Sequence, residues 1–353
     1  MQNIKVLVVG CGHMGSAYAH AYKKIDGFEL IGLVSKDLKK AVRLKKDLHL
    51  PLPTFNNIEE GLSKLQPDAV SINTYPDTHC KFAIMAMKSG ADVFTEKPLA
   101  PTLEEAQNTI KEAQKLGKKL YIGYILHHSP AYKRFIQLGQ KLGRPLVMRM
   151  CLNQQLSGKT WNTCKNFMKS VSPIVDCGVH YVDVMCTITQ AKPLRVHAIG
   201  ANLTKELPKS TFNYGQMQIE FGDGSVGWYE VGWGPMISRS ASSIKDIFGP
   251  KGSISMVKSR HPSDTADFWN NKVLLSHSPE TNQKGEFITE DEEIDLANEP
   301  DWNQLCELQQ RYFLKVIKED IDLTDNHQCA LNTLKIVLAA DKSIQTKEVI
   351  TLN

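Results

Sequence analysis

Residues 5–15, KVLVVGCGHMG, decide the fold of the first part of this chain. Positions 6–9 are apolar and mostly β-branched, which is typical of a parallel strand that is buried on both faces. Gly10, Gly12 and Gly15 follow at once in a G-x-G-x-x-G arrangement, and the small residues of 16–24 predict a helix. Residues 28–35, FELIGLVS, then predict a second strand, so the segment forms one βαβ unit.

The three glycines have separate physical roles. The first permits a tight turn, the second lets the backbone approach a pyrophosphate, and the third lets the helix pack close to the strand. The N–H groups at the start of the helix then face the phosphates. We therefore expect a dinucleotide site, and the alternative is a merely structural glycine turn. The expected contacts in this loop are Gly10, Gly12, His13, Met14 and Gly15.

The end of the second strand bears on the choice of cofactor. In NAD sites an acidic residue about 20 positions after the glycines binds the ribose 2′-hydroxyl. This chain has Ser35 followed by Lys36 there, and Lys39 and Lys40 lie one turn further on. A lysine supplies positive charge for a 2′-phosphate, which favours NADP(H). The alternative is that these lysines are a solvated helix face and that Asp37 binds the ribose of NAD(H).

Strands and helices keep alternating up to residue 123, which predicts a doubly wound parallel sheet. Ligands of such sheets lie at the carboxyl ends of the strands. Two further strands, 67–74 and 91–95, end in polar loops of this kind. We expect these loops to contact the cofactor through Asn73, Thr74, His79, Glu96 and Lys97.

From about residue 145 the pattern changes to alternating strands with Gly and Asp turns, together with a helix at 178–189. This predicts a C-terminal α+β domain with one large, open and mostly antiparallel sheet. We expect a dinucleotide-binding Rossmann domain over 1–125 and a substrate-binding and oligomerisation domain over 126–353, with the option that the final helices pack back on the first. The free face of the sheet predicts a homodimer or homotetramer. Its apolar surface would come from Met217, Ile219, Phe221, Trp228 and Trp233, unless these side chains are internal core.

Several motifs together resemble those of the Gfo/Idh/MocA oxidoreductases, the relatives of glucose–fructose oxidoreductase and inositol dehydrogenase. They are the glycine motif, Pro76-Asp77-Thr78-His79, Glu96-Lys97-Pro98, the D-x-G-x-H-x-x-D of 176–183, and the strand-and-turn pieces at 221–225 and 248–253. The resemblance covers nearly the whole chain. It implies hydride transfer between a nicotinamide and a hydroxyl or carbonyl carbon of a sugar, polyol or keto-sugar. It also implies that Lys97 contacts the reacting oxygen, that His180 is the acid/base and that Asp176 faces the substrate.

The residue types suit this chemistry. Asp176 and His180 are four positions apart, so on a helix they share one face. A carboxylate beside an imidazole orients it for proton transfer near neutral pH, and a lysine ammonium stabilises negative charge on a reacting oxygen. The alternative is a helix-start cap and an ordinary helix-face histidine.

Two departures from the family pattern lie near the expected substrate pocket. The family often has a Gly-rich stretch before the aspartate, where this chain has 170–175, SVSPIV. Where many members have Arg-Phe before a proline, this chain has His127-His128-Ser129-Pro130. These histidines either bind substrate or pack in the loop, so the identity of the substrate stays open. The candidate substrate-binding residues are Tyr124, His127, His128, Trp161 and Asp176.

Composition and residue spacing narrow the classes of function and partner that remain. The 353 residues include 42 Lys+Arg against 38 Asp+Glu, a net charge of +4 with the lysines scattered, so we expect no nucleic-acid partner. No apolar run approaches the roughly 18–20 residues that span a bilayer, and none of the eight cysteines forms C-x-x-C. No pair of His or Cys has zinc-site spacing, so we expect no metal.

We expect a cytoplasmic enzyme with a small-molecule substrate. The alternatives are a non-catalytic nucleotide-binding regulatory protein and a reductase of a non-sugar carbonyl or alkene.

Overall fold

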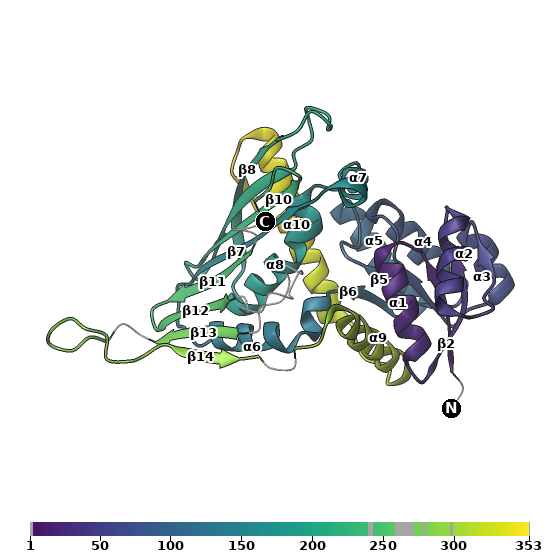
Figure 1. Cartoon of the computed structure of the whole chain (residues 1–353), viewed down its shortest axis with the longest axis horizontal. Coiled ribbons are helices and arrows are strands. Elements are labelled where there is room, and N and C mark those ends of the chain that lie inside the picture. The colour runs from purple at the N-terminus through teal and green to yellow at the C-terminus, as the bar shows by residue number, and fades with distance from the viewer. Residues whose placement is uncertain (1–2, 239–242, 258–271, 278–279, 297–298, 353) are drawn as a thin grey trace. The chain divides into compact units, whose positions relative to one another are not determined.

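The computed structural model describes residues 3–238, 243–257, 272–277, 280–296 and 299–352 (Figure 1). The chain divides into two compact units. Unit 1 consists of Met1–His128 and Pro300–Asn332, and unit 2 consists of Ser129–Glu299 and Thr333–Asn353. Each unit is built around one sheet of its own.

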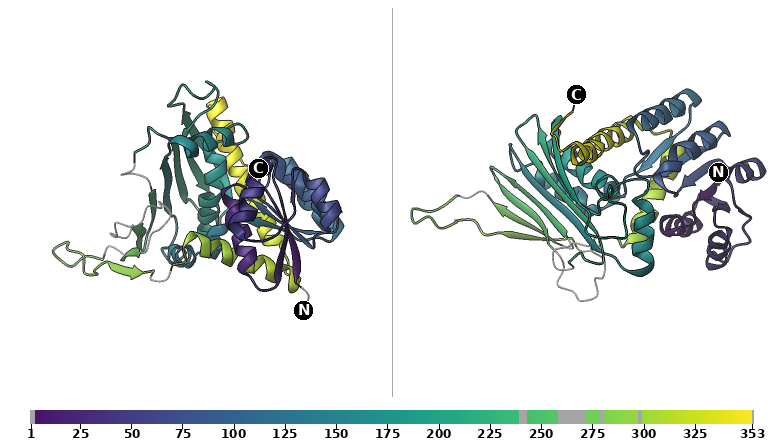
Figure 2. Two further views of the ribbon diagram at one scale, coloured as in Figure 1. Left: turned by 45° about the vertical axis from the view of Figure 1, so that its right-hand side comes forward. Right: turned by 90° about the horizontal axis from the view of Figure 1, so that it is seen from above.

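The sheet of unit 1 is parallel throughout and has the strand order β3-β2-β1-β4-β5-β6. The strands are β1 (Ile4–Val9), β2 (Phe28–Val34), β3 (Thr54–Phe55), β4 (Ala69–Ile72), β5 (Asp92–Glu96) and β6 (Leu120–Gly123). Val6, Leu7 and Val8 are fully buried, because helices cover both faces of the sheet (Figure 2). The predicted doubly wound parallel sheet is confirmed.

The helices of unit 1 connect these strands, and one further helix returns from the C-terminal part of the chain to pack against α1. They are α1 (His13–Lys24), α2 (Leu38–Leu48), α3 (Ile58–Leu65), α4 (Pro76–Lys88), α5 (Leu103–Leu116), the 3₁₀ helix η1 (Ile125–His128) and the returning α9 (Trp302–Lys318). The side chain of Thr102 accepts a hydrogen bond from the Glu105 N–H and so caps α5.

Among the described residues, the sheet of unit 2 has nine strands in the order β14-β13-β12-β11-β7-β10-β9-β8-β15. β7 pairs with β10 in parallel, and the other paired strands are antiparallel, which confirms the predicted second sheet. The strands are β7 (Val147–Gln155), β8 (Pro193–Ala201), β9 (Tyr214–Phe221), β10 (Val226–Gly234), β11 (Ser243–Gly249), β12 (Gly252–Val257), β13 (Lys272–His277), β14 (Glu292–Asp295) and β15 (Ile350–Thr351).

The helices of unit 2 are α6 (Pro130–Gly139), α7 (Gly158–Phe167) and α8 (Pro173–Thr189), and α10 (Thr324–Thr346) contributes its second part. α8 begins five residues before the predicted helix, because Ser172 caps it by accepting from the Val175 N–H and Pro173 occupies its first turn. Within the described ranges, no helix is both long and apolar enough to cross a membrane.

The prediction that five apolar side chains line the free face of this sheet is wrong for four of them. Met217, Ile219, Phe221 and Trp233 are at most 3% exposed, and α8 packs against β9 and β10. Successive side chains of a strand point to opposite faces, so these four share the helix-covered face with Tyr229. Trp228 is half-buried and lies on the other face.

Candidate active site

The glycine loop has a backbone shape that other residues cannot adopt. Gly10 has φ +94°, and a Cβ there would lie 2.4 Å from the carbonyl oxygen of Asn73. A Cβ on Gly15 would lie 1.7 Å from the carbonyl oxygen of Gly10, so α1 can approach β1 only with glycine at this position. These two glycines therefore fix the turn between strand and helix.

Gly12 is different, because a Cβ placed on it would meet no atom of the described residues within 4 Å. It is the N-cap of α1 and offers no side chain to the N–H groups of the first turn, which also contains no acidic residue. Gly12 and His13 are exposed, and Met14 is half-buried. The start of α1 is thus an open set of backbone donors with the positive end of the helix dipole behind it, which fits a pyrophosphate.

Positive charge gathers beside this loop at the end of β2. Ser35 is buried, and the carboxylate of Asp37 accepts from the Lys39 N–H as the cap of α2. Burial raises the pKa of the Cys11 thiol to about 12, and the Lys40 ammonium acts in the opposite direction, so the glycine loop feels the positive charge of Lys40. Lys36 is exposed in the same stretch.

Two of the predicted cofactor residues after β4 are tied into the protein. Asn73 is 8% exposed and donates from Nδ2 to the carbonyl oxygen of Ser71 at 3.0 Å. His79 is 1% exposed, with Nδ1 2.8 Å from the oxygen of Pro98 and Nε2 3.1 Å from the oxygen of Thr74. Burial lowers the pKa of His79, while the two carbonyls act to raise it. The imidazole therefore links the loop after β4 to the loop after β5.

The loop after β5 carries Glu96, Lys97 and Pro98. Glu96 is 8% exposed, and its Oε2 accepts from the Lys97 N–H at 3.2 Å. Its Oε1 accepts from the hydroxyl of Tyr18 at 2.6 Å. The Lys97–Pro98 peptide is cis, and Lys97 is half-buried at the carboxyl edge of the sheet. This is the edge at which parallel sheets bind their ligands.

The candidate substrate residues of unit 1 lie just after β6. Tyr124 is 2% exposed, and its ring stacks on His127 with the centroids 5.7 Å apart. His128 has its Nε2 2.7 Å from the hydroxyl oxygen of Tyr121. Both histidines are half-buried. Each has a contact within the loop and also remains partly exposed.

The candidate acid/base pair lies on α8 in unit 2. In the stretch 173–185 every residue is buried except Asp176 and His180, which are half-buried. They stand one turn apart on a single face of the helix, as the spacing predicted. The Cys177 thiol donates to Asp176 Oδ2 at 3.7 Å. Burial raises the pKa of Cys164 on α7 to about 12 with Asp176 adding to the effect, so this thiol also lies near the carboxylate.

Trp161, the remaining candidate substrate residue, is 4% exposed on α7. Its indole N–H donates to Glu206 at 3.1 Å, and the Lys165 ammonium lies 5.6 Å from its ring centroid. Its polar atom is thus engaged within unit 2. Trp161 belongs to the helix that brings Cys164 close to Asp176.

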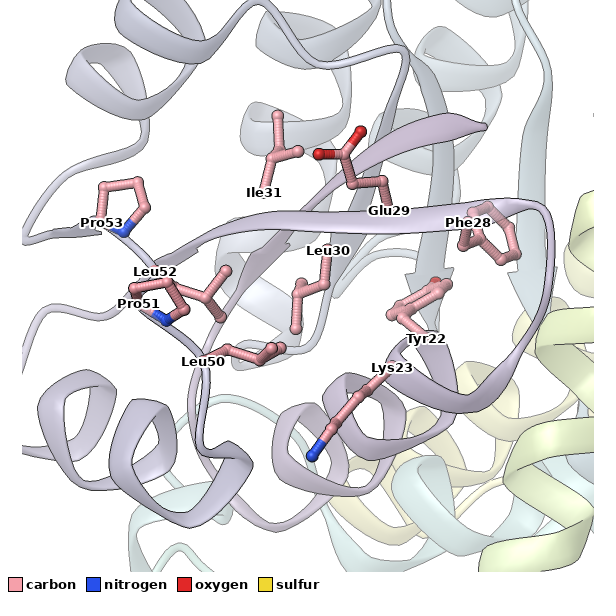
Figure 3. Close-up of a pocket in the computed structure, with 10 residues that line it drawn as sticks. All are labelled: Tyr22, Lys23, Phe28, Glu29, Leu30, Ile31, Leu50, Pro51, Leu52 and Pro53. Atoms are coloured by element: carbon pink, nitrogen blue, oxygen red, sulfur yellow. The ribbon is translucent and has the colours of Figure 1, made fainter. Parts of the chain in front are cut away.

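A surface pocket of about 440 Å³ lies elsewhere in unit 1 (Figure 3). It is lined by Tyr22, Lys23 and residues 28–31 and 50–53. These include the first residues of β2, whereas the glycine loop follows the last residue of β1. Because the two strands are parallel, this pocket lies at the amino edge of the sheet, opposite the glycine loop.

Sequence reasoning missed two polar side chains that reach this site. Tyr18 is three residues after the last glycine of the motif, and a hydroxyl on the inner face of α1 was the available signal. Gln309 of α9 faces Tyr18 with its Oε1 2.7 Å from the hydroxyl oxygen. Nothing in the sequence indicates that contact, because 291 positions separate the two residues.

The fold and these residues define a dinucleotide-binding oxidoreductase class, and comparison with family models gives the family. Residues 4–124 match the GFO/IDH/MocA model described as an oxidoreductase family with an NAD-binding Rossmann fold, and residues 132–255 match the GFO/IDH/MocA C-terminal domain. The chain belongs to the Gfo/Idh/MocA oxidoreductase family, as its motifs predicted.

Curated relatives include dehydrogenases of sugars and polyols. UDP-N-acetylglucosamine 3-dehydrogenase of Acidithiobacillus ferrooxidans is 26% identical, over 84% of this chain and 84% of that protein. The scyllo-inositol 2-dehydrogenase (NAD(+)) of Bacillus subtilis is 27% identical, over 73% of this chain and 75% of its own length. Inositol 2-dehydrogenase of Serratia proteamaculans is 23% identical, but the match spans only 52% of this chain and 53% of that protein.

Solved structures share the fold over almost the full chain. An oxidoreductase from Thermotoga maritima superposes with a TM-score of 0.79 at 21% identity, over 99% of this chain and 98% of that one. The scyllo-inositol dehydrogenase of Lactobacillus casei with bound NAD(H) and scyllo-inositol gives 0.77 at 19% identity, over 99% of both chains. At these identities the likeness concerns the fold.

Proposed function

We propose that this protein is an NAD(P)-dependent dehydrogenase or reductase that acts on a hydroxyl or carbonyl carbon of a sugar, polyol or keto-sugar. The open first turn of α1 at Gly12, in a chain of this oxidoreductase family, is the observation that carries the proposal. The relatives named for UDP-N-acetylglucosamine and inositols support the substrate class.

The backbone around Gly12 fits the cofactor, since a cradle without side chains leaves its donors free for a pyrophosphate. The bound nicotinamide would supply or accept the hydride. In the proposed site the Lys97 ammonium stabilises negative charge on the reacting substrate oxygen. His180 takes the hydroxyl proton in oxidation and returns it in reduction, and Asp176 orients the imidazole from one turn away.

The roles of the other predicted residues follow from their contacts. Gly10, Gly12, His13, Met14 and Gly15 form the phosphate loop. The loops beside it are stabilised by Asn73, Thr74 and His79, because the side chains or carbonyl groups of these residues form hydrogen bonds within unit 1. On the substrate side we keep His127, His128 and Asp176 as contacts, because they are half-buried. Tyr124 and Trp161 then support these contacts from buried positions.

We propose NADP(H) as the preferred cofactor, with NAD(H) as the second option. Ser35 stands where an acidic residue would bind the ribose, and the Asp37 carboxylate already caps α2. The Lys40 ammonium acts electrostatically on Cys11 in the glycine loop, and a 2′-phosphate bound nearby would gain from this positive charge. Several relatives are named for NAD or were solved with it, so this preference would be a property of this chain.

A fluorescence titration tests the cofactor preference without any substrate. We expect NADPH to bind more tightly than NADH. We also expect Lys40→Glu to weaken NADPH binding about tenfold while NADH changes little, because one close ion pair with a phosphate is worth about 1.4 kcal/mol. Lys46→Glu, an exposed lysine in the last turn of the same helix, is the matched control. Tighter binding of NADH would contradict the preference.

A substrate panel tests the activity itself. Sugars, inositols, nucleotide sugars and keto-sugars are offered with each cofactor, and turnover is followed by nicotinamide absorbance. No turnover on a wide panel, with cofactor binding intact, would favour a non-catalytic nucleotide-binding protein. Turnover only on carbonyls or alkenes outside the sugar class would favour a reductase of another substrate on the same fold.

We also propose a homodimer or homotetramer that forms through the free face of the unit 2 sheet. Val147, Val226 and Phe248 are between 38% and 43% exposed and are register neighbours there. The Arg149 guanidinium lies 5.8 Å from the Trp228 ring centroid beside them. Light scattering after size exclusion tests this, and Val226→Glu should give monomers. The cytoplasmic location remains a prediction of the sequence.

A further inference from the structure

Two fully buried glutamines stand where α9 packs on α1. Gln309 and Gln310 are both 0% exposed, although apolar side chains would suffice for helix packing. A buried amide is costly unless it is hydrogen-bonded. Gln310 Oε1 accepts from the Tyr22 hydroxyl at 2.6 Å, and Gln309 Oε1 lies 2.7 Å from the Tyr18 hydroxyl oxygen. The contact at Tyr18 differs from the one at Tyr22, because Tyr18 also reaches Glu96.

The Tyr18 hydroxyl faces two acceptor oxygens but carries a single hydrogen. Its hydroxyl oxygen lies 2.6 Å from Glu96 Oε1 and 2.7 Å from Gln309 Oε1, but a hydroxyl has one hydrogen to donate. Within the part of the chain that the structure describes, Gln309 Nε2 has no hydrogen bond of normal geometry, although its side chain also acts on the nearby Tyr121 hydroxyl and lowers its pKa. Turning the Gln309 amide by half a rotation resolves this conflict at the Tyr18 hydroxyl, since the two ends of an amide have the same shape. Nε2 then donates to Tyr18, and Tyr18 donates to the carboxylate of Glu96.

The Tyr18 hydroxyl keeps its proton under working conditions. Burial raises the pKa of Tyr18 well above its usual value, and the charge of Glu96 adds to the effect. The donor order from Gln309 through Tyr18 to Glu96 is therefore stable across the neutral pH range. A hydrogen bond to a charged acceptor in such surroundings is among the stronger ones.

Glu96 transmits this order to the loop of Lys97. One oxygen of its carboxylate accepts from Tyr18, and the other accepts from the Lys97 backbone N–H at 3.2 Å. Both ends of the carboxylate are thus fixed, and the fixed group is the residue directly before Lys97. Tyr18 belongs to α1, whose first turn is the phosphate loop. The chain of contacts joins three segments that are far apart in the sequence.

We propose that Gln309 and Tyr18 form a buried hydrogen-bond relay that orients Glu96 and thereby sets the position of Lys97. Both are positioning residues, because neither touches the reacting atoms. The proposal deepens the function proposed above and rests on the role of Lys97 given there. It predicts that loss of the Tyr18 hydroxyl lowers the rate of the chemical step and leaves cofactor binding largely intact.

Tyr18→Phe tests the relay in the full-length protein, and Tyr22→Phe is its matched control. Both tyrosines are buried in α1, and both hydrogen-bond a glutamine of α9, but only Tyr18 contacts Glu96. We expect Tyr18→Phe to lower kcat about 10- to 100-fold, the range for losing a hydrogen bond to a charged group. KM for the cofactor should change by no more than about threefold. Tyr22→Phe should keep kcat near the wild-type value.

A second readout needs no activity. An amine-reactive reagent and mass spectrometry give the labelling rate of Lys97, with exposed Lys88 as the internal reference. Tyr18→Phe should change the Lys97 rate relative to Lys88, and Tyr22→Phe should not. If the wild-type protein turns over no substrate, the proposed function fails, and the labelling still decides on the relay. The relay would be overturned if Lys97 were labelled at the same rate in Tyr18→Phe, Tyr22→Phe and the wild type. Equal kcat values in these three proteins would overturn it as well.

Gln309→Met provides a milder test if Tyr18→Phe does not fold by circular dichroism. This substitution removes the amide and keeps a side chain of similar length. The hydrogen bond from Tyr18 to Glu96 remains, but the Tyr18 hydroxyl loses the hydrogen bond that it accepts from Gln309. We expect kcat to fall about 2- to 10-fold. Gln310→Met is the control and should leave kcat and Lys97 labelling unchanged. An unchanged kcat and labelling rate in Gln309→Met would remove Gln309 from the relay.

Discussion

Asp341→Asn offers a quantitative test of how α8 is held. Asp341 on α10 is partly exposed, and its Oδ1 accepts from the Ser172 hydroxyl at 2.6 Å. Ser172 is the residue that caps α8, the helix of Asp176 and His180. Burial raises the pKa of Asp341 to about 6, and the hydrogen bond from Ser172 only partly opposes this.

The sign of the pH effect follows from the raised pKa. In the unfolded chain this carboxyl titrates near its ordinary value of 3.8, and in the folded protein it titrates at about 6. The folded state holds the proton more tightly, so this group favours folding at low pH. That contribution is lost as pH rises through about 6. Asparagine cannot titrate, and its carbonyl oxygen can still accept from Ser172.

The magnitude follows from the same values. A rise of the pKa from 3.8 to about 6 corresponds to about 3 kcal/mol in the free energy of unfolding. Because Asp341 is partly exposed, solvent reduces this value, and we expect about 1–2 kcal/mol. Asp341→Asn should therefore be more stable than the wild type above about pH 7, and the difference should shrink towards zero below about pH 4, where the carboxyl is protonated in both states.

Thermal unfolding measured at several pH values checks this prediction. We expect the variant to unfold about 2–6 °C above the wild type at about pH 8, with little difference at about pH 3. Asp291→Asn, at an exposed position of the same unit, should leave the pH dependence unchanged. A stability difference that stays the same at both pH values would refute the reasoning.

Three further predictions concern the proposed site. Lys97→Ala and His180→Ala should each lower turnover by roughly 100-fold or more while the cofactor still binds; unchanged rates would remove these residues from the mechanism. Gly12→Val should fold normally but bind dinucleotide poorly, because its side chain would occupy open space at the phosphate loop; full-strength nicotinamide binding would argue against that placement. Gly15→Val should instead lower the melting temperature, because its Cβ would collide with the backbone of Gly10; calorimetry of the two variants separates the effects.

The sequence by itself was sufficient for the parallel sheet and its ligand edge. The buried strand at 6–9, the glycine motif and the alternation of strands with helices are local patterns, and each reflects a local physical requirement. The Thr102 cap and the shared face of Asp176 and His180 were predictable for the same reason, because they depend on spacing within one helix. The family followed from motifs that keep their spacing along the chain.

Only the tertiary structure decided which groups meet across long stretches of chain. It brought α9 against α1 and so placed Gln309 beside Tyr18 and Glu96, a contact that no local pattern encodes. It also turned Met217 and its neighbours towards α8, because alternation along a strand gives two faces but does not say which one a helix covers. Burial of His79 between two carbonyls likewise depends on two loops meeting. Such contacts depend on packing between distant segments, so the spacing of residues along the sequence does not predict them.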